Sequence, residues 1–72
     1  MALYQLTSEE RELEGETYMG YGIAGIQDGR IIAEVRDISA EREYVDKLID
    51  LCNVQNAAPE HLKDVVEDYI ID

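Results

Sequence analysis

Residues 21–35 read YGIAGIQDGRIIAEV and contain the clearest β-hairpin signal of the chain. Two runs rich in apolar and β-branched residues flank Asp28-Gly29, a pair typical of the tight turn of a β-hairpin because both residues tolerate positive φ. The stretch therefore predicts two antiparallel strands. One runs from about Glu16 to Gln27, and the other runs from Arg30 to Asp37.

The register of this hairpin depends on the length of its turn. A strict two-residue turn pairs Gln27 with Arg30 and places Tyr21 and Ile23 on the face of Ile32 and Glu34. A three-residue connection, with Gly29 in a left-handed bulge, shifts the pairing by one residue. One face then carries Leu6, Tyr21, Ile23, Ile31, Ala33 and Val35. Because a one-residue slip moves every side chain to the other face, the hydrophobic pattern favours the bulge.

A further strand precedes the hairpin, from about Leu3 to Leu13, with Glu14-Gly15 as a two-residue turn. Its outer part, residues 9–12, is strongly polar. We expect this part to project beyond the hydrophobic core.

The second half of the chain has helical periodicity. Ser39 is a suitable N-cap, and Asn53 is expected as the left-handed residue after the first helix, with Val54 packing back on Ile49. The buried stripe of this helix is predicted to be Val45, Leu48, Ile49 and Cys52, flanked by Tyr44 and Leu51.

Pro59 is expected to open a second helix, because its fixed φ suits the first helical position. The predicted buried stripe of this helix is Leu62, Val65, Val66, Tyr69 and Ile70. The loop between the helices is short, so the helices are expected to be antiparallel neighbours. Residues 1–72 are thus predicted to form a single α+β domain, in which a three-stranded antiparallel sheet is followed by two antiparallel helices packed on one face.

The chain is strongly acidic, with seventeen Asp and Glu against six Lys and Arg and a net charge of -11. This charge argues against direct binding to nucleic acid or to an anionic membrane, and it permits binding to a basic protein. At 46% hydrophobic residues, the chain is too apolar for a disordered acidic tail. A single cysteine, with no signal peptide or membrane span, predicts a cytoplasmic protein.

Several short motifs resemble a family of small bacterial proteins known only as a domain of unknown function. The motifs are Tyr21-Gly22-Ile23, Asp37-Ile38-Ser39, Leu51-Cys52-Asn53 and the block Pro59 to Tyr69. The resemblance covers roughly residues 18–71, and its most specific part lies around His61-Leu62 and Glu67-Asp68. It implies the order of strands before helices and brings no catalytic residue.

Residues 20–25 match the pattern G-x-G-x-x-G, but a turn and a strand follow them instead of the helix that a dinucleotide site needs. His61, Asp64 and Asp68 share one side of the second helix and offer a weak alternative as metal ligands. Cys52 belongs to a buried stripe at a helix C-terminus, where the dipole disfavours a thiolate. We therefore expect neither an enzyme nor a bound cofactor.

Two groups of residues are candidates for partner contact. They are Tyr18, Ile26 and Ile32 on the sheet, and Asp64, Glu67 and Asp68 on the last helix. Ile71 is expected to point away from the helix stripe. These features favour a non-enzymatic interaction or regulatory module that associates with itself through the sheet. The alternative is an acidic inhibitor that mimics nucleic acid and binds a basic nucleic-acid-binding protein.

Overall fold

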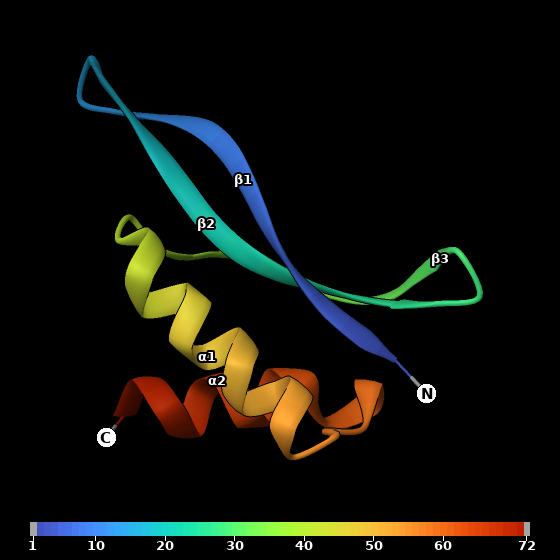
Figure 1. Cartoon of the computed structure of the whole chain (residues 1–72). Coiled ribbons are helices and arrows are strands. Elements are labelled where there is room, and N and C mark those ends of the chain that lie inside the picture. The colour runs from blue at the N-terminus through green and yellow to red at the C-terminus, as the bar shows by residue number, and fades with distance from the viewer. Residues whose placement is uncertain (1, 72) are drawn as a thin grey trace.

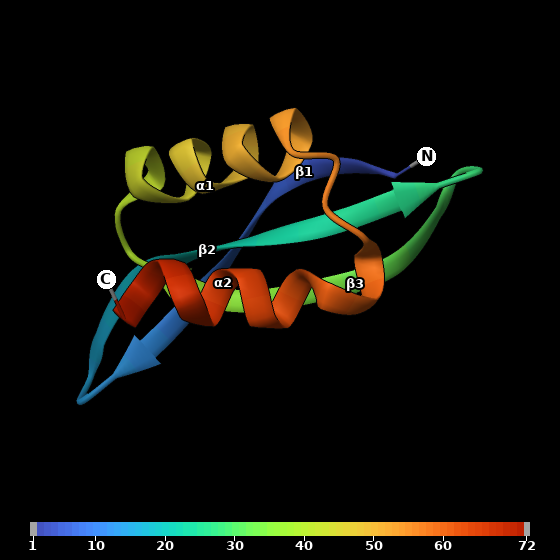
Figure 2. The same cartoon turned by 90° about the horizontal axis from the view of Figure 1, so that it is seen from below.

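The computed structural model describes residues 2–71, and only the backbone of Ile71. In chain order the elements are β1 (Leu3–Leu13), β2 (Glu16–Gln27), β3 (Arg30–Ser39), α1 (Arg42–Val54), the short 3-10 helix η1 (Pro59–His61) and α2 (Leu62–Ile71). The strands form one antiparallel sheet in the order β1-β2-β3. Both helices lie on the same face of it and run antiparallel to each other (Figure 1, Figure 2). The predicted α+β fold is confirmed.

Both hairpin turns are two residues long. The central residues have positive φ in each case, 52° and 82° at Glu14-Gly15 and 54° and 75° at Asp28-Gly29. Two positive values define a type I′ turn, whose twist matches that of the flanking strands. Gln27 accordingly pairs with Arg30, so the predicted bulge at Gly29 is wrong.

The shift in register occurs inside β3 instead. Ile26 pairs with Ile31 but Gly25 pairs with Ala33, which leaves Ile32 as one extra residue. Beyond this bulge Ala33 and Val35 reach the core face, as predicted. Ile31 does not, because it precedes the bulge and shares the opposite face with Ile26.

The core lies between the sheet and the helices. Its buried members are Tyr4, Ile23, Val45, Leu48, Ile49, Cys52, Leu62 and Val66. The predicted stripe of α1 is confirmed in full, with Tyr44 and Leu51 packed beside it. The ring centroids of Tyr44 and Tyr69 lie 5.2 Å apart and join the two helices.

The helix ends differ from the prediction. Ser39 ends β3, and its Oγ accepts a hydrogen bond from the N–H of Glu41 (3.0 Å), so α1 begins three residues later. Asn53 lies inside the last turn of α1, where its side chain bonds to Tyr4 of β1, and Asn56 takes the left-handed conformation (φ 52°) instead.

Two apolar residues expected against the core are exposed. Val54 is 84% exposed because α1 continues through it, which turns its side chain away from Ile49. Ile70 is also exposed, since the sheet rises away from the C-terminal end of α2 (Figure 1). The prediction for Ile71 concerns a side chain outside the described part of the chain.

Candidate interaction surfaces

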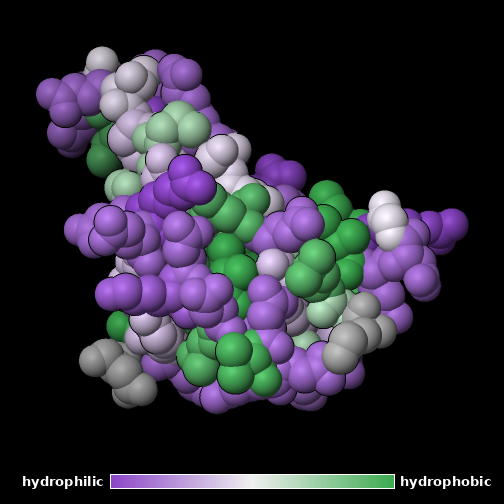
Figure 3. Space-filling view, in the orientation of Figure 1, coloured by the Kyte–Doolittle hydropathy of each residue, from purple (hydrophilic) through white to green (hydrophobic). Residues whose placement is uncertain are grey.

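The face of the sheet opposite the helices carries a group of apolar side chains, here called the apolar patch. Leu3, Ile26 and Ile31 are cross-strand neighbours, and Ile32 follows as the bulged residue. Leu3, Ile31 and Ile32 are 54%, 63% and 44% exposed, and none of the four residues packs against the core. Figure 3 shows apolar surface gathered above this end of the sheet.

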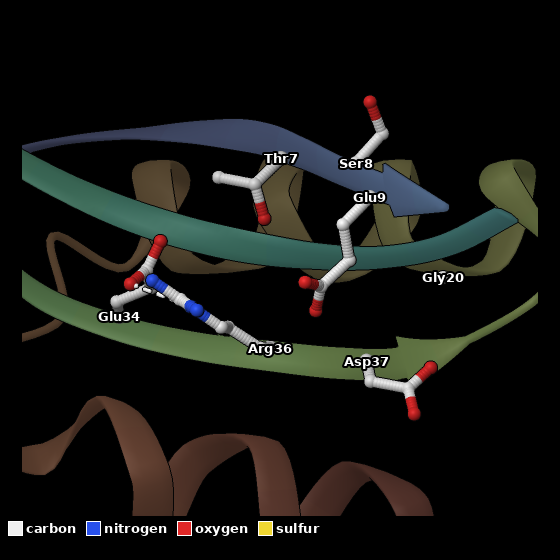
Figure 4. A pocket seen from close by; sticks show the side chains of 7 residues that line it. All are labelled: Thr7, Ser8, Glu9, Gly20, Glu34, Arg36 and Asp37. Atoms are coloured by element: carbon white, nitrogen blue, oxygen red, sulfur yellow. Dashed lines mark hydrogen bonds and ion pairs between the residues drawn. The ribbon is translucent and has the colours of Figure 1, made fainter. Parts of the chain in front are cut away.

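A shallow furrow of about 220 Å³ lies further along the same face (Figure 4). It is lined by Thr7, Ser8, Glu9, Gly20, Glu34, Arg36 and Asp37. Each of its three carboxylates contacts an arginine, since Glu34 pairs with Arg36 (3.0 Å), and Arg11 pairs with both Glu9 (3.0 Å) and Asp37 (3.2 Å). The furrow therefore has little uncompensated charge with which to attract a ligand.

The glycines of the G-x-G-x-x-G pattern are explained by close packing within the sheet. A Cβ at Gly22 would collide with the backbone of β3 at Val35 and Arg36, where the strand bulges. A Cβ at Gly25 would lie 3.0 Å from the ring of Tyr4. The pattern sits in the middle of β2 and is followed by β3, so no helix N-terminus is available for a pyrophosphate.

Beyond this furrow the β1–β2 hairpin continues as a two-stranded ribbon of residues 9–20, here called the arm (Figure 1). None of its residues belongs to the core or packs against it. Arg11 holds the base of the arm through ion pairs with Glu9 and with Asp37 of β3. The hydrogen bond to Glu9 and the nearby Asp37 carboxylate raise the pKa of Arg11. The Tyr18 hydroxyl lies 3.5 Å from the same carboxylate. Asp37 has positive φ (52°) at the second irregularity of β3.

Tyr4 links β1 to the helical layer through three hydrogen bonds. The Asn53 amide accepts from the Tyr4 N–H (3.0 Å) and donates to the Tyr4 carbonyl (3.2 Å), as a neighbouring strand would. The Tyr4 hydroxyl donates to the Ala57 carbonyl. Burial raises the pKa of this phenol, and the neighbouring Cys52 and Glu60 raise it further. Asn53 thus covers the free edge of β1 at one residue.

The second helix presents its acidic residues to solvent. Asp64, Glu67 and Asp68 are all exposed, and His61 Nδ1 lies 3.9 Å from Asp64 Oδ2. Among residues 2–71, no group of three His, Cys, Asp or Glu side chains is arranged to hold a metal ion.

Cys52 is buried, and this burial raises the pKa of its thiol, which makes it a poor nucleophile.

The predicted contact residues are therefore spread over three surfaces. Ile26 and Ile32 belong to the apolar patch. Tyr18 lies on the arm, eight residues along β2 from Ile26 or roughly 26 Å for an extended strand. The acidic residues of α2 lie in the helical layer, on the other side of the sheet.

Sequence reasoning missed Leu3 and Ile31 as members of the apolar patch. The predicted bulge at Gly29 places Ile31 on the core face, which is wrong because the turn has two residues. Two signals in the sequence could have placed Leu3 and Ile31 beside Ile26. Leu3 alternates with the core residue Tyr4, and a two-residue turn at Asp28-Gly29 pairs Ile26 with Ile31.

No helix in the described part of the chain is long and apolar enough to cross a membrane.

Comparison with known proteins places the chain in a family. The chain matches no curated protein and no solved structure. It does match the model of one protein family over residues 2–72, further than the 18–71 expected from its motifs. The chain belongs to this family, which is described as a family of unknown function (DUF6514).

Proposed function

We propose that this protein is a non-enzymatic interaction module that associates with a second copy of itself through the apolar patch. The observation that carries the proposal is the exposure of Leu3, Ile31 and Ile32, around the half-buried Ile26, on the face of the sheet that no helix covers. An apolar group of this kind, standing outside the core of a small soluble domain, is typical of a contact surface.

Electrostatics permit a second copy as the occupant if the contact lies away from the densest carboxylates. Two chains that each carry a net charge of -11 repel each other, so a self-contact needs a region remote from the densest carboxylates. The apolar patch contains no ionisable side chain and lies at the end of the sheet opposite the arm. The arm of each chain lies roughly 26 Å along β2 from that chain's own patch, about three Debye lengths at physiological salt, so its charges are largely screened at the patch. Burial of the patch also adds apolar area that a 72-residue chain lacks.

Light scattering after size exclusion, at low and high salt, tests the proposal. We expect a dimer that persists at high salt, because apolar contacts are not screened. Ile31→Lys should give a monomer, while Val54→Lys, the same type of change at an exposed residue of α1, should leave the dimer intact. A wild-type protein that is monomeric at both salts would contradict self-association.

Mimicry of nucleic acid is the second candidate. It is favoured by the exposure of Asp64, Glu67 and Asp68 on α2, together with a second set of glutamates on the arm. Capture of a basic nucleic-acid-binding protein, with release at modest salt, would support this candidate, and competition by DNA for the same protein would be required. For either candidate we propose the cytoplasm as the compartment, since the free thiol of Cys52 suits a reducing environment.

A further inference from the structure

The arm has two different faces. On one face Arg11 pairs with both Glu9 and Asp37 of β3, as described above. The other face continues the core face of the sheet beyond the helices, and it carries Glu10, Glu12, Thr17 and Met19, with Glu10 opposite Met19 and Glu12 opposite Thr17. These four residues are here called the bare face. All four are exposed, and Figure 2 shows the arm extending past both helices.

The charges of the bare face are uncompensated. Within residues 2–71, no ion pair involves Glu10 or Glu12, nor Glu14 and Glu16 at the turn. The arm holds five glutamates and one arginine, and that arginine is already engaged with Glu9 and Asp37. A carboxylate row beside an apolar Met19 side chain complements lysine or arginine, because each combines an aliphatic stem with a cationic end.

The backbone of the arm favours an extended partner. The β1–β2 pairing keeps one register from Leu3↔Ile26 to Leu13↔Glu16. The N–H and C=O of Tyr4 point to the free edge, where Asn53 binds them. In an antiparallel ladder this orientation recurs at every second residue, so the same backbone groups of Glu10 and Glu12 also face outward. Asn53 covers the edge only at Tyr4, and an added strand can bind further along it.

We propose that the arm docks an extended, lysine- or arginine-rich segment of a partner protein, which adds a strand beside Glu10 and Glu12 on the outer edge of β1. The backbone groups of that edge hold the segment, and its cations at alternate positions reach the two carboxylates. This docking is independent of the apolar patch, so it can hold whether or not the protein forms a dimer.

The test uses the whole chain, labelled with ¹⁵N, and an eight-residue amidated peptide that alternates lysine with valine or threonine. In titrations followed by amide chemical shifts, we expect the largest changes within residues 6–20. The double variant Glu10→Gln with Glu12→Gln should weaken binding about fivefold, as expected for the loss of two exposed charge pairs. The matched control is Glu67→Gln with Asp68→Asn, which removes the same charge from α2 and should change the affinity less than about twofold.

Three outcomes would overturn the proposal. Equal weakening of peptide binding in both double variants would mean that the peptide does not recognise the arm specifically. It would respond either to the net charge or to an acidic surface that includes α2, which is what nucleic-acid mimicry requires. Shift changes centred on α2 would place the segment elsewhere. If the Glu10/Glu12 double variant no longer forms the wild-type dimer but binds the peptide as before, the arm would be a contact surface for a second copy of the chain. The apolar-patch proposal is tested separately by Ile31→Lys, so the failure of one does not imply the failure of the other.

Discussion

The inner and outer parts of the β1–β2 hairpin share one continuous register but have different surroundings. In the inner part, Tyr4 and Ile23 are almost completely buried under the helices. In the outer part, the arm, Leu13 is 65% exposed and none of the apolar side chains packs against the core. Strand pairing and core formation are therefore separable in this hairpin. Hydrophobic burial stabilises the inner part, whereas the arm relies on backbone pairing, its turn and the contacts of Asp37.

The largest expected difference between the two regions comes from removing an apolar side chain from each. Leu48→Ala should lower the free energy of unfolding by about 3 kcal/mol, because it leaves a cavity in the core. Leu13→Ala at the tip of the arm should change it by less than about 0.5 kcal/mol. Urea denaturation measures both, and a comparable loss for Leu13→Ala would show that the arm takes part in a core.

The junction between the regions is tested at Asn53. Asn53→Ala removes both side-chain hydrogen bonds to Tyr4, and we expect a loss of about 1.5 kcal/mol in urea denaturation. Gln55→Ala, at an exposed residue of the same segment, serves as the control and should have little effect. Equal stability of the two variants would mean that the edge of β1 is not held at this point.

The dispensability of the arm for folding is tested by shortening it. Replacing residues 10–19 by an Asn-Gly turn joins Glu9 to Gly20, which are already paired. We expect the free energy of unfolding to change by less than about 1 kcal/mol, since only exposed contacts and ladder bonds are lost. Failure of this variant to fold would contradict the separation of the two regions. The variant should also lose binding of the basic peptide.

Alkaline pH should act on the core beneath the inner part, through Cys52 of α1. Burial raises the pKa of Cys52 above its ordinary value of 9.0, so the native state retains a proton that the unfolded state releases. Stability is therefore complete below pH 9 and declines as the pH rises above it. Thermal melting from pH 7 to 10.5 measures the decline. In Cys52→Ala the loss of stability should begin at a higher pH, where the Tyr4 phenol of the unfolded state ionises. The ordinary pKa of a tyrosine is 10.0, and burial also raises the pKa of Tyr4. An unchanged pH profile would show that the thiol does not contribute.

Most of the fold is readable from local patterns. Period-two and helical periodicities identify all three strands and both helices, and the Glu14-Gly15 and Asp28-Gly29 pairs locate the turns. The candidate surfaces were only partly predictable. Ile26 and Ile32 lie in the apolar patch as expected, whereas Ile31 was placed on the wrong face because hydrophobicity alone cannot distinguish a bulge at Gly29 from one at Ile32.

The α+β class, the order of the elements and the acidic charge can be derived from the sequence alone, because they follow from periodicity, turn chemistry and composition. The register of β3 and the partner of Asn53 are set only when the chain packs into its tertiary structure. Each of these depends on contacts between residues distant in the chain, such as Tyr4 with Asn53 and Arg11 with Asp37. Local preference cannot rank such contacts, since their free energies depend on burial and geometry that arise when the sheet and helices pack together.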